Sequence, residues 1–316
     1  MHAEELRTDA APAARWETEW RLRTRRVKLG RRTLVMGIVN VTPDSFSDGG
    51  KYFAPERAVA HGLELLEQGA DLLDVGAEST RPGSQAGRAE ALVGTEEEQA
   101  RLLPVVEGIL RERPESIVSI DTYKAATARA GLAAQAEIVN DVSGLLWDEA
   151  MAGVCAEAGC GVVLMHTRGR PEEWKTQPRL ADAEIVAAVR AGLAASLETA
   201  ARAGIAQEAI VLDPGYGFGK RFEENYALLA RQAELLALGR PLLAGVSRKS
   251  FLGRTLAPFH DGKDAPLAQR ETASLAALTA AILHGASIAR VHTVGTAAEA
   301  ARIADEVASH LRSVSY

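Results

Sequence analysis

From Thr33 onward, short runs rich in Val, Ile and Leu alternate with longer stretches in which apolar residues recur with helical period. The apolar runs predict strands at 33–40, 71–77, 116–121, 137–141, 161–166, 209–215, 241–247 and 286–292. Helical stretches follow them at 55–68, 96–113, 125–134, 148–158, 182–203, 223–238, 267–284 and 297–312. Apolar strands separated by helices are typical of a parallel sheet covered on both faces. The repeated unit therefore predicts an α/β fold, a single-domain (β/α)₈ TIM barrel.

The first 32 residues stand apart from this pattern, which assigns 33–316 to the barrel domain. Residues 1–14 are rich in Ala, Pro and charge, and this composition predicts a mobile tail. The segment from Trp20 to Leu34 carries apolar residues among arginines, with Gly30 within it. We expect it to form a small hairpin around Gly30 that closes the bottom of the barrel.

Charge and composition narrow the function further. The net charge of −6 argues against nucleic acid as the main partner, because backbone binding needs a basic face. A local basic pocket for a small anion remains compatible with that charge. No apolar run is long enough for a membrane span, and residues 1–20 lack the apolar core of a signal peptide, so we expect a cytoplasmic protein. Cys155 and Cys160 lack zinc-site spacing and predict buried thiols in a reducing compartment.

Each predicted strand consists mainly of apolar residues and ends on polar residues, most of which can carry a charge. These are Asn40, Asp74, Asp121, Asn140 with Asp141, His166, Asp213, Ser247 with Arg248 and Lys249, and Arg290 with His292. Polar strand ends can be simple loop entries. In a (β/α)₈ barrel, however, the carboxyl ends of the strands carry the active site. The number of chargeable groups at these ends therefore predicts an active site there.

One group of strand-end residues suits a flat heterocycle. Asp121, Asn140, Asp213 and Lys249 come from four strands and offer two carboxylates, an amide and an ammonium. Such a set can satisfy a ring that presents both donors and acceptors. The alternative is a core network of Asp–Lys pairs that satisfy one another, since buried polar groups need partners.

A second group suits a phosphate or pyrophosphate. Asn40, Arg81, Arg290 and His292 combine forked guanidinium donors with an amide and an imidazole, and Thr80 adds a hydroxyl. The alternatives are a solvated loop arginine at position 81 and a packed histidine at position 292.

Two loops have distinctive composition. Residues 42–52 are small, polar and Gly-rich, with Phe46 as an aromatic residue, which fits either an active-site lid or an ordinary surface loop. The segment DPGYGFGK (213–220) fails both the P-loop and the dinucleotide-binding spacings. Its glycines predict a tight turn that presents Phe218 to a ligand. No arrangement of nucleophile and base indicates a covalent mechanism, and no cluster has zinc-site spacing.

Two long motifs of the chain are MGIVNVTPDSFSDGG (36–50) and DVGAESTRPG (74–83). They are similar to the two signatures of the dihydropteroate synthase family. The stretches SIDTYK, VNDVSG, LMHTRG, LDPGYGFGK, GVSRKSFLG and RVH then follow in the family's order, so that the resemblance covers about residues 33–310. It implies a (β/α)₈ barrel, a homodimer and a role in folate biosynthesis. The reaction implied joins 6-hydroxymethyl-7,8-dihydropterin pyrophosphate to p-aminobenzoate with Mg²⁺ and releases pyrophosphate by an SN1-like displacement.

The resemblance also assigns roles to residues of this chain. It implies that the pterin is held by Asp121, Asn140, Met165, Asp213 and Lys249. The p-aminobenzoate pocket is implied at Thr80, Arg81, Pro82, Phe218, Ser247 and Lys249. Asn40 would bind the magnesium–pyrophosphate, and Arg290 and His292 the pyrophosphate. Asp121, Asp48, Lys249, Arg290 and His292 are the implied catalytic residues, Asp48 lying with Phe46 on the first loop. Thr293 departs from the family, which commonly continues RVH with Asp.

Three alternatives accompany this interpretation. A pterin-binding methyltransferase domain would share the barrel but would not need the STRPG and SRKS segments, which are both present. A paralogue without synthase activity would bind pterin and give no product. A nucleotide-dependent oxidoreductase is suggested by the glycines of 215–219 but lacks its fingerprint.

Overall fold

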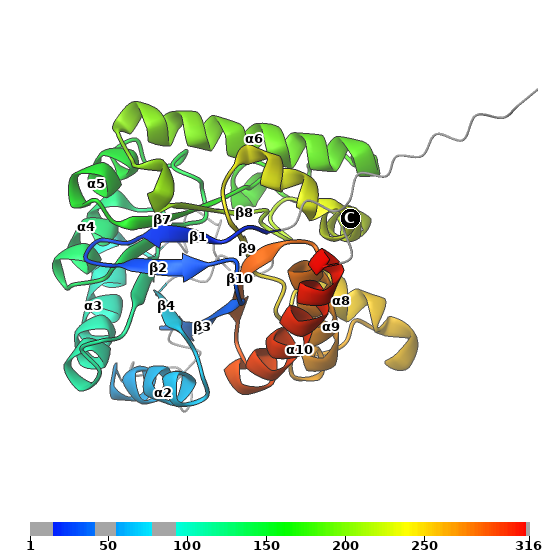
Figure 1. The fold of residues 1–316 in the computed structure, drawn as a ribbon, viewed down its shortest axis with the longest axis horizontal. Helices are drawn as coiled ribbons and strands as arrows, with labels where there is room; N and C mark the ends of the chain where they lie inside the picture. Colours follow the sequence, from blue (N-terminus) through cyan, green and yellow to red (C-terminus); the bar gives the residue numbers. More distant parts are fainter. Residues whose placement is uncertain (1–14, 42–54, 78–92, 314–316) are drawn as a thin grey trace, which may run out of the picture.

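A computed structural model of the chain describes residues 15–41, 55–77 and 93–313. Eight parallel strands close into a barrel in the order β10-β3-β4-β5-β6-β7-β8-β9 (Figure 1). Their bounds are β3 Leu34–Asn40, β4 Leu72–Gly76, β5 Val118–Asp121, β6 Ile138–Asp141, β7 Gly161–Met165, β8 Ile210–Asp213, β9 Leu242–Ala244 and β10 Ala286–Val291. The predicted (β/α)₈ barrel is confirmed, since each strand lies within the apolar run that predicted it.

Helices surround the barrel (Figure 1). They are α2 Pro55–Glu67, α3 Thr95–Glu112, α4 Ala125–Ala133, α5 Met151–Ala158, α6 Asp182–Ala203, α7 Phe222–Arg231, α8 Ser250–Thr255, α9 Glu271–Leu283 and α10 Val294–Ser313. The predicted helix at 223–238 continues beyond α7 as 3₁₀ helix over Gln232–Leu238. Helix α8 was not predicted, because its six residues are too few to show a helical period.

The strands separate two apolar layers because successive side chains point to opposite sides of the sheet. Outward residues such as Val35 and Val39 pack beneath the helices. Inward residues near the amino ends of the strands fill the barrel: Leu34, Met36, Leu72, Ile138, Val163, Val211, Leu243 and Ile288. At the carboxyl ends of the strands, most of the inward-facing positions are polar. Asp121 and Asn140 are two of them, and they are register partners on neighbouring strands. The apolar filling therefore forms the floor beneath the predicted site.

An antiparallel hairpin of β1 (Thr18–Arg21) and β2 (Arg26–Leu29) lies across the amino-terminal end of the barrel (Figure 1). Trp20, Leu22 and Leu29 join the apolar cluster inside the barrel, and the Trp20 indole Nε1 donates a hydrogen bond to the Ala209 carbonyl at 2.8 Å. The expected hairpin at the barrel bottom is confirmed.

The expected position of the hairpin turn was wrong. The chain reverses between Leu22 and Arg25, where the Leu22 amide donates to the Arg25 carbonyl at 2.8 Å, and Gly30 follows β2. Gly30 has φ +93°, and a Cβ there would lie 2.0 Å from the Trp16 carbonyl oxygen. Glycine is therefore required at this position for the close approach of Trp16 and for its left-handed backbone, not for the turn.

Replacing Trp20 with Ala should lower the free energy of unfolding by about 3–5 kcal/mol, as for other fully buried aromatic side chains. The side chain is 1% exposed and fills the floor of the barrel. Urea unfolding followed by circular dichroism measures the effect, and Trp16→Ala, at a 39% exposed position, is the control. A loss for Trp20→Ala no larger than that of the control would contradict the hairpin's role in closing the barrel.

Candidate active site

The described residues predicted for the site gather at the carboxyl ends of the strands. Asn40, Asp121, Asn140, Met165 and Asp213 end or nearly end β3, β5, β6, β7 and β8. Ser247 and Lys249 follow β9, Arg290 lies within β10, and His292 follows it. The predicted site residues Asp48, Thr80, Arg81 and Pro82, and Phe46 beside them, lie outside the described residues, and their roles stay predictions.

Arg290 connects the two groups that the sequence suggested separately. Its Nη2 donates to Asp121 Oδ2 at 2.6 Å, and its Nε donates to Asp74 Oδ2 at 2.6 Å. Asn140 Nδ2 donates to the same Asp74 oxygen at 2.9 Å. The residue expected to hold an anion is thus paired with the carboxylate expected to hold a ring, and Asp74 links both to Asn140.

Asp74 was among the polar strand-end residues of the sequence, but it is the residue of this network to which the sequence interpretation gave no role. It is fully buried, and its Oδ1 has no hydrogen-bond partner among the described residues. One signal was available in the sequence: a carboxylate stands inside an otherwise apolar strand, two residues after the inward-facing Leu72. A charge placed there faces the barrel interior and needs a partner.

The electrostatics of this network keep Arg290 charged and bring the pKa of Asp121 close to neutral pH. Burial raises the pKa of Asp121 to about 7, while the charge of Arg290 opposes the rise and that of Asp74 adds to it. Burial lowers the pKa of Arg290, but the carboxylates of Asp74 and Asp121 more than compensate and raise it above its ordinary value. Near pH 7 the charge on Asp121 therefore responds to whatever binds beside it.

Asp213 lies on the other side of the site, buried beside the glycine-rich turn. Its Oδ1 accepts a hydrogen bond from the Gly215 amide at 2.7 Å. Burial raises the pKa of Asp213, opposed by this hydrogen bond and by the charges of Lys249, Arg290 and Lys220. The Lys249 Nζ lies 4.1 Å from the centre of the Phe218 ring, a cation–π distance. An ammonium and an aromatic ring thus border the site together.

The glycine-rich turn is held from inside by Lys220. Its buried Nζ donates to the carbonyls of Gly215, His166 and Phe218 at 2.7, 3.1 and 3.3 Å. Gly215, Gly217 and Gly219 all have positive φ. Because backbone carbonyls occupy the Lys220 ammonium, it fixes the turn, and the resemblance of this segment to a phosphate-binding loop carries no weight.

Ser247 and His292 form a pair at the rim, with Ser247 Oγ 2.9 Å from His292 Nδ1. The His292 amide also donates to this oxygen at 3.3 Å. Beside them, Arg248 Nη2 donates to Thr293 Oγ1 at 3.0 Å. Thr293, which departs from the family pattern, is therefore a hydrogen-bond partner of Arg248.

The described residues offer a divalent cation few protein ligands at this site. In the described part of the chain, no three His, Cys, Asp or Glu side chains are grouped so that they could hold a metal ion. Asn40 is half-buried at the end of β3. Mg²⁺ commonly takes one or two protein oxygens together with substrate phosphates and water, and an amide oxygen at this rim fits that pattern.

Known proteins similar to this chain share both its sequence and its fold. The family model described as pterin binding enzyme matches residues 36–292. A dihydropteroate synthase of Mycobacterium leprae is 46% identical over 273 residues, which cover 85% of this chain and 91% of the relative. The chain belongs to the dihydropteroate synthase family. The resemblance seen in its motifs is thereby confirmed, together with the expected enzyme class, a transferase of folate biosynthesis.

Solved structures of family members agree with this assignment. A Xanthomonas albilineans dihydropteroate synthase with 4-aminobenzoic acid is 39% identical, with a TM-score of 0.79, and the match covers 92% of this chain and 98% of the other. A second structure of the X. albilineans enzyme, in complex with 7,8-dihydropteroate, is 37% identical with a TM-score of 0.76, and the match covers 92% of this chain and 98% of the other.

Among the described residues, none of the helices combines the length and apolar character required to span a bilayer.

Proposed function

We propose that the chain condenses 6-hydroxymethyl-7,8-dihydropterin pyrophosphate with p-aminobenzoate, giving 7,8-dihydropteroate and pyrophosphate. The observation that carries this proposal is the network in which Arg290 joins Asp74 and Asp121 at the carboxyl end of the barrel. It places a permanent cation beside a carboxylate whose pKa is close to 7. That combination suits a reaction in which an anion leaves and a cation forms.

The pterin would bind above the apolar floor of the barrel. Its contacts would be the strand-end residues Asp121, Asn140, Asp213, Met165 and Lys249. Carboxylates accept from ring and amino N–H groups, the ammonium donates to a ring carbonyl, and the amide does both. Asn140 and Asp213 are 6% and 5% exposed, which leaves a small polar surface for a ligand to complete. Met165 packs with Val142 and Phe218 and would form the apolar side of the slot.

The p-aminobenzoate and the pyrophosphate group would bind beside the pterin. Phe218, Ser247 and Lys249 would border p-aminobenzoate, together with Thr80, Arg81 and Pro82, and Arg290 and His292 would hold the pyrophosphate. Asn40 would hold Mg²⁺ with the pyrophosphate, and the ion when bound would supply charge neutralisation of that leaving group.

The reaction proceeds as an SN1-like displacement. The bond between the exocyclic methylene carbon and the pyrophosphate oxygen breaks first, and its electron pair leaves with the pyrophosphate. The cation left on the methylene is shared with the pterin ring, where Asp121 supplies stabilising negative charge. The neutral amine of p-aminobenzoate then attacks the methylene carbon and forms a C–N bond. The resulting ammonium gives its proton to water or to the released pyrophosphate, and because the amine is neutral before attack, no strong base is required. The loop carrying Asp48 would close over the cation.

A coupled assay on the purified chain tests this proposal. We expect pyrophosphate and dihydropteroate to appear together, only when both substrates and Mg²⁺ are present. Tight pterin binding without product would instead support the silent paralogue or the methyltransferase, which a methyl-tetrahydrofolate donor would separate. The homodimer and the cytoplasmic location also stay predictions.

A further inference from the structure

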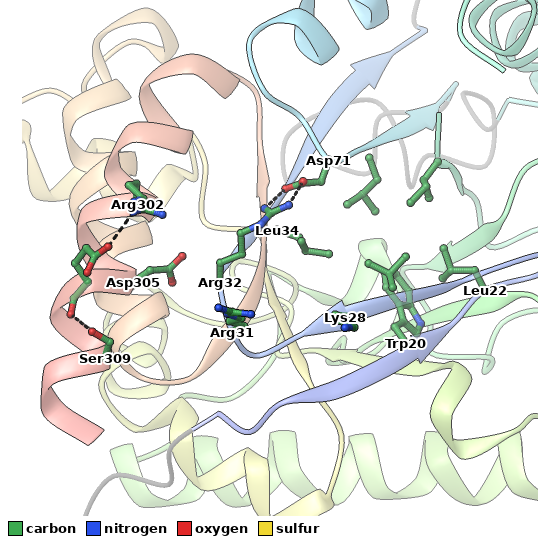
Figure 2. A pocket seen from close by; sticks show the side chains of 14 residues that line it. Trp20, Leu22, Lys28, Arg31, Arg32, Leu34, Asp71, Arg302, Asp305 and Ser309 are labelled. Atoms are coloured by element: carbon green, nitrogen blue, oxygen red, sulfur yellow. Dashed lines mark hydrogen bonds and ion pairs between the residues drawn. The ribbon is translucent and has the colours of Figure 1, made fainter. Parts of the chain in front are cut away.

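A cavity of about 610 Å³ lies at the amino-terminal end of the barrel, opposite the site described above. It opens between the hairpin, the segment leading into β3 and the face of α10 that carries Arg302, Asp305 and Ser309 (Figure 2). Its volume is within the range of about 300–1,000 Å³ usual for small-molecule sites. None of the residues assigned to the proposed reaction lines it, so the inference below does not depend on that reaction.

The apolar part of the lining comes from the hairpin and the beginnings of the strands. It consists of Trp20, Leu22, Val27, Leu34, Leu72 and Ile117. Most of these side chains are almost completely buried by the rest of the protein, so the floor is fixed by the same packing that closes the barrel. Such a floor suits a compact apolar body.

The acidic groups that line the cavity are all neutralised by partners. Asp71 accepts from Arg32 Nη1 and Nη2 at 2.8 and 2.5 Å, as Figure 2 shows. Asp305 is ion-paired with the buried Arg15. Glu306 lies 3.1 Å from Arg302 Nη2. None of these carboxylates is therefore left to attract a cation.

Two positively charged residues of the lining are not paired with these carboxylates. Lys28 and Arg31 line the cavity, and neither has an ion-pair or side-chain hydrogen-bond partner among the described residues. The cavity therefore carries an excess of positive charge above an apolar floor. Arginine and lysine side chains in this arrangement complement a carboxylate, sulfonate or phosphate.

We propose that this cavity is a second binding site, for a small organic anion with a compact apolar body and one acidic group. The apolar body would contact Val27 and Ile117, the partly exposed apolar residues of the lining, above the buried Trp20 and Leu34. The acidic group would bind Lys28 and Arg31 at the rim. The site is separate from the catalytic end of the barrel.

Two dyes with the same ring system test the proposal by fluorescence titration of the full chain. The anion 8-anilinonaphthalene-1-sulfonate should bind saturably, one molecule per chain. N-phenyl-1-naphthylamine, which lacks the sulfonate, should bind about tenfold more weakly, as expected for the loss of a charge-assisted contact. The variant Lys28→Gln/Arg31→Gln should bring the affinity of the anion close to that of the neutral dye and leave the neutral dye unchanged.

The control variant Arg190→Gln/Arg202→Gln removes the same charge from exposed positions on α6, and it should bind both dyes as the unmodified chain does. Equal affinities for the two dyes, or equal losses in both double variants, would overturn the proposal. Anion binding that appears only after removal of residues 1–14 or 314–316 would also overturn it, since the chain itself would then cover the cavity.

Discussion

Replacing Asp121 with Asn is expected to lower kcat by about a hundredfold or more, the size of effect seen when one stabilising group is removed from a developing charge. The substitution keeps the shape of the side chain and removes its charge. In the structure, Asp121 Oδ2 accepts from Arg290 Nη2 at 2.6 Å, so the carboxylate is already oriented at the end of β5. An amide there cannot supply negative charge to the cation that forms on the pterin.

Steady-state kinetics with both substrates saturating measure this effect. Asp182→Asn, at an exposed position of α6, serves as the control and should leave kcat unchanged. A turnover for Asp121→Asn within about threefold of the unmodified enzyme, or roughly 0.7 kcal/mol, would show that the electrostatic role is wrong.

The same residue gives the reaction a pH dependence with a defined sign. The pKa of Asp121 is about 7, raised chiefly by burial. Because the anionic form is the stabilising one, kcat/KM should rise as the pH increases through about 7 and become level above it. This acidic limb should be missing in Asp121→Asn. Its persistence there would assign the limb to a group other than Asp121.

The barrel could be predicted from the sequence because its strands are buried on both faces. Such strands appear as continuous apolar runs, and the helices between them keep their own period. The hairpin turn could not be placed in the same way, since residues 22–25 contain neither Gly, Pro, Asn nor Asp. That turn is stabilised from elsewhere in the fold: the Thr24 amide donates to Glu137 Oε2 at 2.8 Å, and Arg23 Nε donates to the Ala136 carbonyl at 3.0 Å.

The candidate site shows the same division between local and distant information. The position of Asp121 at a strand end follows from the pattern, and its neighbour Asn140 follows from the pairing of consecutive strands. The pairing of Arg290 with Asp74 and Asp121 cannot be predicted from such patterns, because 216 and 169 residues separate the partners along the chain. Barrel closure between β10 and β3 brings them together, and no local pattern records which side chains then meet.

Replacing Asp74 with Ala should lower both the stability and the turnover of the enzyme. Asp74 is fully buried, and one of its oxygens accepts from Arg290 at 2.6 Å and from Asn140 at 2.9 Å. Removing one partner of a buried ion pair costs about 3–5 kcal/mol where the other charge is left unpaired. Arg290 keeps Asp121 as a partner, so the loss in the free energy of unfolding should lie below that range. Arg290 would also lose the contact that orients its guanidinium, so that kcat should fall with the free energy of unfolding.

Asp74→Asn separates the charge of Asp74 from its geometry. An amide oxygen can still accept from Arg290 and Asn140, so the geometry is kept and the free energy of unfolding should fall less than in Asp74→Ala. The negative charge that raises the pKa of Asp121 would be gone, and Arg290 would be shared with one carboxylate fewer. Both changes lower the pKa of Asp121, so the acidic limb of kcat/KM should move below pH 7. Urea unfolding and the pH profile measure the two effects separately. If Asp74 were only a packing residue, Asp74→Asn would leave that limb in place, and this outcome would remove Asp74 from the catalytic network.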